Sequence, residues 1–224
     1  MKKLKVGVFG ATGRMGQEVL ELLKNSKQFA PSLEISRSQP VSYSDLKKID
    51  ILIDFSLPAG FQEALAMAVK SGKPIVSGTT GLSSADQKAL MAAAQKIPVL
   101  WAPNMSLGVA TLMKTLEAFS ALKSFDFQIE ETHHRHKKDK PSGTAILLQK
   151  KLESVVGRKL PDPLALRGGG VFGDHQVHAM GDNETLVFEH RALNRKLFAE
   201  GAIRAAQWLV DQKKGLYELK DILD

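Results

Sequence analysis

Residues 4–24 read Leu4-Lys-Val-Gly-Val-Phe-Gly10-Ala-Thr-Gly13-Arg-Met-Gly16-Gln-Glu-Val-Leu-Glu-Leu-Leu-Lys24. The segment from Leu4 to Phe9 alternates and is rich in β-branched residues, which predicts a first strand. From Gln17 to Lys24 the apolar residues recur at helical spacing, which predicts a helix. A glycine turn between a strand and a helix is typical of a dinucleotide-binding domain, although a plain strand-to-helix turn is the alternative interpretation.

The three glycines of this turn follow the spacing G-x-x-G-x-x-G, which differs from the commoner G-x-G-x-x-G. Each glycine still has a physical role in the expected turn. Gly10 makes the tight turn, Gly13 lets a pyrophosphate approach the backbone, and Gly16 lets the helix pack on the strand. The pattern therefore predicts a Rossmann-type domain that binds a dinucleotide.

The end of the second predicted strand, residues 32–36, indicates which dinucleotide is bound. Rossmann domains usually place Asp or Glu at this position to hold the ribose 2′-hydroxyl. Here the strand ends in Ser36-Arg37-Ser38, and serine with arginine suits a 2′-phosphate, which a carboxylate would repel. We therefore expect NADPH to be preferred to NADH. An alignment shifted by one residue would bring Glu34 into consideration instead.

Further β-α repeats fill the chain up to Met105. Strands are predicted at residues 49–56, 73–77 and 97–102, with helices from Pro58 to about Ser71 and from Ser83 or Ser84 to Lys96. The strands end in polar loops, among them Gly78-Thr-Thr-Gly81 and Pro103-Asn-Met-Ser106. Ligands of open α/β sheets bind at the carboxyl ends of strands. Residues 1–105 are therefore predicted to form the dinucleotide-binding domain.

The pattern changes after Ser106. We predict a long helix over residues 107–122, a strand over 125–131, a helix over 145–156, and antiparallel strands over 171–178 and 185–190. Arg167-Gly-Gly-Gly170 is interpreted as a flexible joint. Residues 106–196 are predicted to form an α+β domain for substrate binding and oligomerisation. A helix over 198–210, within a C-terminal segment 197–224, is expected to return to the first domain.

The stretch with the densest chemistry is Glu131-Thr-His-His-Arg-His-Lys-Lys-Asp-Lys-Pro-Ser-Gly-Thr-Ala145. Its histidines titrate near neutral pH and can donate protons. Ser142, Gly143 and Thr144 precede a predicted helix, whose unpaired N–H groups favour carboxylate or phosphate. The combination predicts an anionic substrate held at Ser142 to Thr144 and protonated by a nearby His or Lys.

Two simpler interpretations of this stretch stand beside catalysis: a solvated loop and an adventitious metal site. His133, His134 and His136 form a cluster that could chelate, but it has no obvious carboxylate partner in register. A zinc site requires further ligands at characteristic spacing, and the chain has no cysteine to provide them. Metal binding therefore ranks second, and no metal site is predicted.

Composition narrows the class of protein further. Of 224 residues, 43% are hydrophobic and 25% charged, as in soluble globular proteins. The apolar runs are shorter than the ~20 residues a membrane helix needs, and strand-like sequence begins at the N-terminus without a signal peptide. We expect a cytoplasmic protein with no membrane partner. The net charge of +7 could indicate nucleic acid, but the lysines are spread through every segment and form no recognised nucleic-acid motif. An anionic substrate and cofactor explain the charge equally well, and we predict no nucleic-acid partner.

Several motifs in order along the chain resemble one family. They are Gly10-Ala-Thr-Gly-Arg-Met-Gly16, Gly78-Thr-Thr-Gly81, Pro103-Asn104, the stretch from His133 to Ala145, Gly173-Asp-His175, Phe198-Ala-Glu-Gly-Ala202 and Gly215-Leu-Tyr217. Together they resemble 4-hydroxy-tetrahydrodipicolinate reductase, also called dihydrodipicolinate reductase, of bacterial and plant lysine (diaminopimelate) biosynthesis. The resemblance implies an oxidoreductase that uses NADPH or NADH to reduce a cyclic dicarboxylic imine, with loss of water.

The resemblance also implies roles for individual residues. His133 would be the general acid/base and Lys137 the second proton donor, while His134, Gly143 and Thr144 would bind the substrate carboxylates. Arg37 falls where the family contacts the adenosine ribose, and Ser36 stands where many members have Glu. The family is typically a homotetramer built through the sheet of its second domain. The cofactor would be lined by Gly10, Ala11, Thr12, Gly13, Arg14, Met15, Gly78, Thr79, Thr80, Ala102, Pro103, Asn104 and Met105.

Two other classes of protein fit parts of the sequence. A redox-sensing regulator with a Rossmann domain would bind NADPH without turnover, and it would not need histidines and lysine beside an anion site. A metal-dependent hydrolase using His133, His134 and His136 would lose activity with a chelator and ignore NADPH. The chain is also shorter than typical family members, through a trimmed stretch before Asp50 and a compact region at residues 167–173.

Overall fold

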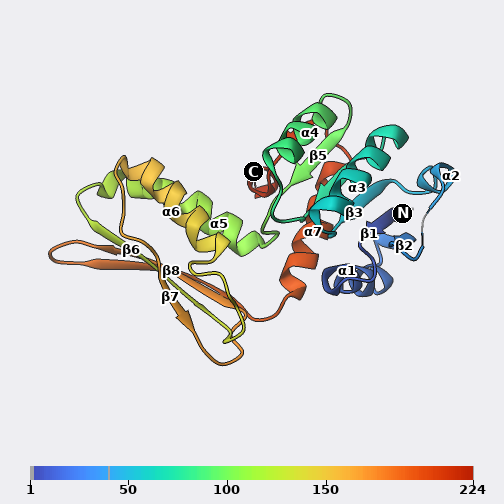
Figure 1. The fold of residues 1–224 in the computed structure, drawn as a ribbon. Coiled ribbons are helices and arrows are strands. Elements are labelled where there is room, and N and C mark those ends of the chain that lie inside the picture. Colours follow the sequence, from blue (N-terminus) through green and yellow to red (C-terminus); the bar gives the residue numbers. More distant parts are fainter. Residues whose placement is uncertain (1–2, 40, 224) are drawn as a thin grey trace. The chain divides into compact units, whose positions relative to one another are not determined.

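The computed structural model describes residues 3–39 and 41–223. The chain divides into two compact units, which are described separately (Figure 1). The first unit comprises the chain up to Leu107 together with the segment from Lys196 onward, and the second comprises Gly108–Arg195. Within the described residues, no helix is long and apolar enough to cross a membrane.

The first unit is built on a parallel sheet, which has six strands within the described residues. The strand order is β10-β5-β4-β3-β1-β2, with every neighbouring pair parallel. The central strands are buried on both faces, so they read as continuous apolar runs such as Ile51-Leu-Ile53. The strands are β1 (Leu4–Phe9), β2 (Phe29–Ile35), β3 (Ile51–Asp54), β4 (Ile75–Ser77), β5 (Pro98–Trp101) and β10 (Gly215–Tyr217).

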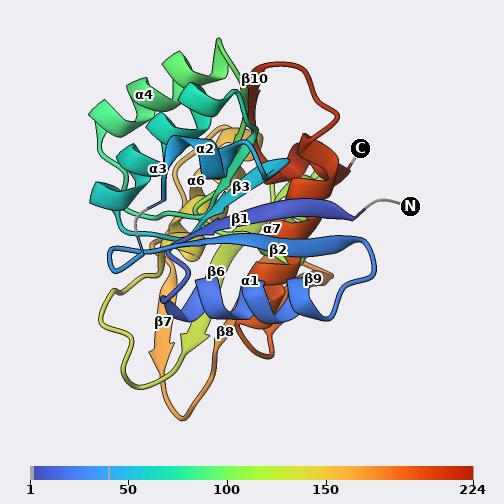
Figure 2. The ribbon, with the colours of Figure 1, turned by 90° about the vertical axis from the view of Figure 1, so that its right-hand side faces the viewer.

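Helices cover both faces of this sheet (Figure 2). One face carries α3 (Pro58–Ser71) and α4 (Ser84–Ala94), and the other carries α1 (Arg14–Lys24) and α7 (Lys196–Leu209). The return of α7 to the first unit confirms the expected path of the C-terminal helix, and the parallel sheet confirms the Rossmann-type fold. The small residues of α7 allow close packing: a Cβ on Gly201 would overlap the carbonyl oxygen of Met105. Short helices α2 (Tyr43–Leu46) and η2 (Leu219–Leu223) complete the unit.

The second unit, described throughout, is a four-stranded mixed sheet in the order β7-β6-β8-β9 with helices on one face. Strand β6 runs parallel to β7 and antiparallel to β8. Buried and less buried residues alternate along β6 and β8, and the buried set, including Phe127, Ile129 and Val177, packs with Leu148 and Leu152 of α6. The elements are α5 (Leu107–Thr115), η1 (Leu116–Leu122), β6 (Asp126–His133), α6 (Gly143–Val156), β7 (Leu164–Arg167), β8 (Gly173–Met180) and β9 (Thr185–Ala192).

Local features of both units differ from the sequence-based expectation. The helix expected over residues 107–122 becomes a 3₁₀ helix from Leu116, because Leu116, Phe119 and Leu122, spaced by three, all pack into the same core. Arg167 is the last residue of strand β7 rather than part of a flexible joint. Neither β7 nor β10 was expected, since neither contains a β-branched residue, which is a type that favours strands.

Candidate active site

The glycine turn after β1 has the close geometry that the sequence predicts. Gly10 has a φ of +81°, and a Cβ there would lie 2.7 Å from the carbonyl oxygen of Phe55. A Cβ on Gly16 would overlap the carbonyl oxygen of Gly10, so only glycine allows the first turn of α1 to lie this close. Helix α1 begins at Arg14, earlier than expected, with Gly13 as its N-cap. Because Gly13 has no side chain, no side-chain cap satisfies the first amides of α1.

A buried carboxylate anchors the loops that follow β3 and β4. Asp54, fully buried at the end of β3, accepts hydrogen bonds from Ser77 Oγ at 2.7 Å, Thr79 Oγ1 at 2.9 Å and Ser56 N at 3.0 Å. Burial raises the pKa of Asp54, although these hydrogen bonds oppose the rise. The indole of Trp101 donates to Thr79 O at 2.9 Å. Both the hydroxyl and the backbone carbonyl of Thr79 therefore form hydrogen bonds within the protein.

The other predicted cofactor residues lie in loops at the carboxyl ends of neighbouring parallel strands. Arg37 follows β2 and is exposed, beside Ser36 and Ser38, whose hydroxyls are 3.0 Å apart. After β5, the Asn104 side chain accepts a hydrogen bond from Ser106 N at 2.8 Å. The exposed members of the set are Thr12, Gly13, Arg14, Arg37, Thr80 and Pro103, and the buried ones are Ala11, Thr79, Ala102 and Met105.

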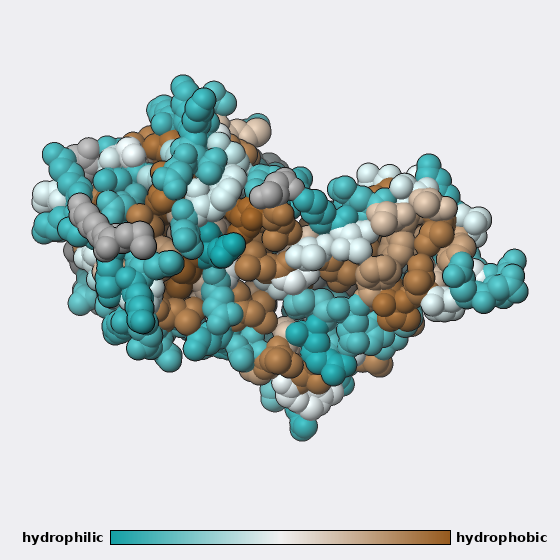
Figure 3. Space-filling view, turned by 180° about the vertical axis from the view of Figure 1, so that it is seen from behind, coloured by the Kyte–Doolittle hydropathy of each residue, from teal (hydrophilic) through white to brown (hydrophobic). Residues whose placement is uncertain are grey.

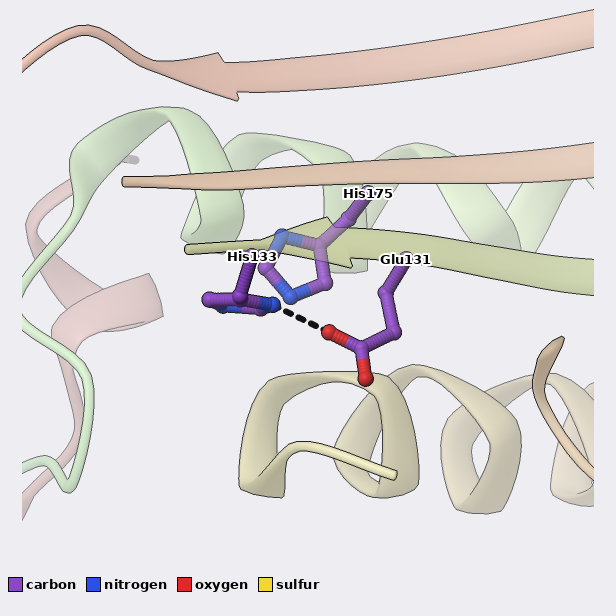
Figure 4. Close-up of side chains that lie close together, drawn as sticks. All are labelled: Glu131, His133 and His175. Carbon is purple, nitrogen blue, oxygen red and sulfur yellow. Dashed lines mark ion pairs between the residues drawn. The ribbon is translucent and has the colours of Figure 1, made fainter. Parts of the chain in front are cut away.

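In the second unit, His133 is the last residue of β6 rather than part of a loop, and it is buried. Glu131 lies two residues earlier and on the same face of the strand, and its Oε2 forms an ion pair with His133 Nδ1 (Figure 4). The expectation that the histidines have no carboxylate partner in register was therefore wrong. A strand has a period of two, which places Glu131 beside His133.

The second oxygen of Glu131 is also held. Oε1 accepts hydrogen bonds from Arg167 Nη2 at 2.7 Å and from Ser142 N at 3.2 Å. Burial acts to raise the pKa of Glu131, but the Arg167 hydrogen bond and the nearby charges outweigh it and lower that pKa. Arg167 Nη2 also donates to Asp139 O at 2.6 Å, which ties down the loop after β6. Sequence reasoning found no role for Glu131 or Arg167.

His175 on β8 joins the same group. Its ring centroid is 5.1 Å from that of His133, at an interplanar angle of 79°, and its Nε2 lies 3.2 Å from Ser142 Oγ. Burial and, secondarily, the positive charge of protonated His133 lower the pKa of His175 to about 4, so its ring is neutral at neutral pH. Burial also lowers the pKa of His133, while Glu131 opposes this effect. The alternation of the predicted strand over 171–178 carried the signal that His175 points inward.

The start of α6 lies where the sequence predicts an anion site. Helix α6 begins at Gly143, and its N-cap Ser142 accepts a hydrogen bond from Ala145 N at 3.2 Å. A Cβ on Gly143 would meet no described atom within 4 Å, so the first residue of α6 borders open space. Lys137 pairs with Asp139 at 2.8 Å, and its hydrogen bond lowers the pKa of that carboxyl. The half-buried His134 lies near the exposed His136, with ring centroids 6.2 Å apart.

The structure thus gathers His133, Ser142, Gly143 and Thr144, with His134 and Lys137 on the connecting loop, while His136 stays at the surface. Among the described residues, Glu131, His133 and His175 are the group whose atoms, all within 4.8 Å of one another, could ligate a metal ion. Glu131, however, already balances its charge against Arg167 and His133. Proton transfer next to a bound anion is the chemistry that this arrangement supports best.

Comparison with known proteins gives matches over nearly the whole chain. The family model for the dihydrodipicolinate reductase N-terminus matches residues 4–105, and the model for the C-terminus matches residues 108–223. The 4-hydroxy-tetrahydrodipicolinate reductase of Bdellovibrio bacteriovorus is 49% identical over 223 residues, covering 100% of this chain and 97% of the relative. The reductase of the same name from Sulfurimonas denitrificans is 41% identical over 253 residues, covering 99% of each chain.

A solved structure shares the fold. Dipicolinate-bound dihydrodipicolinate reductase from Paenisporosarcina sp. TG-14 aligns with a TM-score of 0.82 at 21% identity, over 99% of this chain and 100% of that one. The engineered D-amino acid dehydrogenase bound to NADP⁺ aligns less closely, with a TM-score of 0.60 at 12% identity, over 100% of this chain and 96% of that one. These likenesses show the architecture, in which a parallel-sheet unit is combined with a second sheet.

Proposed function

This chain belongs to the dihydrodipicolinate reductase family, and on that premise we propose how its residues divide the reaction between them. The reaction is the reduction of 4-hydroxy-tetrahydrodipicolinate to tetrahydrodipicolinate in lysine biosynthesis through diaminopimelate. A nicotinamide nucleotide is the reductant in the proposal, and when bound it supplies a hydride to the substrate ring. The chain's own residues hold the dicarboxylate, deliver protons and bind the nucleotide.

The observation that carries the proposed substrate site is the position of His133 beside the start of α6. The N-terminus of α6 and the cations of the loop over residues 134–140 provide positive potential for an anion. A substrate with two carboxylates matches this site in charge. The Paenisporosarcina relative was solved with dipicolinate, a dicarboxylate of the same chemical class, which supports the match. His134, Ser142, Gly143 and Thr144 are the proposed carboxylate ligands.

Proton delivery is assigned to His133 and Lys137. Hydride addition to a conjugated imine leaves an electron pair on carbon or nitrogen, and a proton must arrive there as the bond forms. His133 carries that proton on a buried ring next to the anion site, and Lys137 is the second donor. Water leaves in the same overall reaction, so one proton from the enzyme, one hydride and the hydroxylated substrate give product and water.

The nucleotide is proposed to bind at the carboxyl edge of the parallel sheet. The exposed backbone at Gly13 and the uncapped amides of α1 suit a pyrophosphate, because a helix N-terminus attracts anions. The loop after β4 is held rigidly by Asp54, so its backbone is preorganised beside the turn. The proposed contacts are Gly10, Ala11, Thr12, Gly13, Arg14, Met15, Gly78, Thr79, Thr80, Ala102, Pro103, Asn104 and Met105.

We expect Arg37→Ala to weaken NADPH binding by roughly tenfold to hundredfold while leaving NADH binding within about twofold. The exposed guanidinium beside Ser36 and Ser38 can form charged hydrogen bonds to a 2′-phosphate, and such bonds contribute about 1.5–3 kcal/mol. Fluorescence titration with each nucleotide measures the two constants. Lys27→Ala removes an exposed cation before β2 instead, and it serves as the matched control. An equal loss for both nucleotides in Arg37→Ala would contradict the NADPH preference.

A homotetramer is also part of the proposal. The face of the second sheet that points away from α6 carries exposed apolar side chains: Leu164, Leu166, Met180 and Val187. Apolar residues also reach the surface in Figure 3, among the hydrophilic ones. Exposed apolar side chains of this kind favour association of subunits. Sedimentation equilibrium measures the number of chains in the assembly directly.

A further inference from the structure

Glu131 and Arg167 are buried charged residues that the proposed reaction leaves without a role. The Glu131 side chain is fully buried, and that of Arg167 is 6% exposed. They come from neighbouring parallel strands, where His133 of β6 stands in register with Arg167 of β7. Burying charged side chains lowers the stability of the fold unless the charges are paired. The arrangement of this pair around one histidine indicates a role beyond packing.

We propose that Glu131 and Arg167 position His133, so that Nδ1 carries a proton toward Glu131 and Nε2 is the nitrogen that serves the substrate. The inference rests on the proposed function of His133 and adds the groups that aim it. Glu131 and Arg167 are positioning residues, since their contacts are with protein groups.

The carboxylate of Glu131 is fixed at both oxygens. Oε1 is held by Arg167 Nη2 at 2.7 Å and by Ser142 N at 3.2 Å, and Oε2 faces His133 Nδ1. Figure 4 shows the carboxylate between the imidazole of His133 and the start of the helix below it. Because Ser142 is also the N-cap of α6, the same contacts tie the imidazole to the proposed carboxylate site.

The other nitrogen of His133 faces a residue without a side chain. A Cβ on Gly173 would lie 2.8 Å from Nε2, so glycine keeps this position clear. Nδ1 is the ring nitrogen that forms the ion pair with Glu131 Oε2, and among the described residues no ion pair involves Nε2. A ring held at Nδ1 is oriented for proton transfer through Nε2, as in other carboxylate-histidine pairs.

Four charged or titratable groups face His133 from the elements around it. Glu131 on the same strand stabilises the imidazolium form, while Arg167 on β7 and Lys137 on the loop destabilise it. His175 on β8 is neutral near pH 7 and lies edge-on to the ring. The two members of the positioning pair therefore have opposite effects on the proton affinity of His133. Replacing Glu131 and replacing Arg167 should therefore shift the pKa of His133 in opposite directions, which a role in packing alone would not produce.

The test is the pH dependence of kcat/KM for two variants. The imidazolium is the acid, so activity falls as pH rises through the pKa of His133, which burial places below its ordinary value. Glu131→Gln removes the charge that stabilises the imidazolium, so the fall in kcat/KM should move to lower pH by about one unit or more. At pH values above the shifted pKa of His133, kcat/KM should be roughly tenfold lower than in the wild type, and it should recover when the pH is lowered. Arg167→Met removes a destabilising charge, so the fall should move to higher pH.

The matched control for Glu131→Gln is Glu130→Gln. Glu130 is the preceding residue of β6, points to the opposite face of the sheet and should leave the pH profile in place. Equal losses at every pH in Glu131→Gln and Arg167→Met, with no movement of the profile, would overturn the inference. So would loss of wild-type activity with a chelator and its return with Zn²⁺, because Glu131, His133 and His175 would then be metal ligands.

A second measurement uses the wild-type protein and needs no turnover. The ¹⁵N chemical shifts of the His133 ring distinguish the two neutral tautomers, and the Nδ1–H form is expected above the pKa of His133. An Nε2–H tautomer would overturn the inference even if the variants failed to fold. If His133→Ala retained full activity while the tautomer was Nδ1–H, the proposed function of His133 would fail and its positioning by Glu131 would stand.

Discussion

His133→Ala is expected to lower kcat by ~10²–10⁴ while the NADPH dissociation constant stays within about twofold of wild type. General acid help from a positioned side chain is typically worth that much in rate. The loss should appear in kcat because the proton is needed as the substrate is reduced, and because His133 belongs to the unit that does not carry the glycine turn. Steady-state kinetics with saturating dicarboxylate, together with a fluorescence titration of NADPH, measures both quantities.

The matched control for this variant is the same change at the next residue. His134 is half-buried on the loop after β6 and is proposed to bind a substrate carboxylate. His134→Ala should therefore raise KM for the dicarboxylate, with kcat changed far less than in His133→Ala. If the two variants showed the same pattern, the division between proton donor and carboxylate ligand would be wrong. Loss of NADPH binding in His133→Ala would also count against the assignment.

Gly16→Ala is expected to raise the NADPH dissociation constant by about tenfold to hundredfold. A Cβ at this position would overlap the carbonyl oxygen of Gly10 and lie 2.9 Å from Ala11 Cα. These are backbone atoms, so the first turn of α1 must move away from the glycine turn. The amides that are proposed to bind the pyrophosphate would then lose their alignment, and hydrogen bonds to a charged group contribute about 1.5–3 kcal/mol.

A loss of stability could imitate this result, and Gly72→Ala controls for it. Gly72 ends α3 in the left-handed conformation, with a φ of +67°, and a Cβ there would meet no described atom within 4 Å. Alanine at this position costs about 1 kcal/mol of backbone strain and leaves the glycine turn untouched. Gly72→Ala should therefore bind NADPH normally while melting at a lower temperature. Unchanged NADPH affinity in Gly16→Ala would show that the close approach at this turn is not required for binding.

Local signals explain which features the sequence could predict. The glycine turn and the helix start at Ser142 are set by residues close together in the chain, and both lie near their expected positions. The short apolar strands of the first unit likewise have the continuous pattern that is typical of a buried parallel sheet. Membership of the family, with its reaction, is confirmed because the motifs span both units.

The contacts around His133 could not be read from local patterns. Glu131 and Arg167 are separated by 36 residues, and they meet because the four-residue strand β7 pairs with β6. Ser142 and His175 are 33 residues apart and meet only when β8 pairs with β6. The register between strands is a property of the tertiary structure. The sequence around a residue therefore does not reveal which residue lies opposite it on the neighbouring strand.

The most direct test of the account is the absorbance of reduced nicotinamide after enzyme is added to freshly generated 4-hydroxy-tetrahydrodipicolinate. One trace uses NADPH and the other NADH. The account predicts oxidation that requires the dicarboxylate, with the NADPH trace faster because of Arg37. No oxidation with either nucleotide, in a protein shown by titration to bind them, would contradict the account and favour a regulator that senses the nucleotide without turning it over.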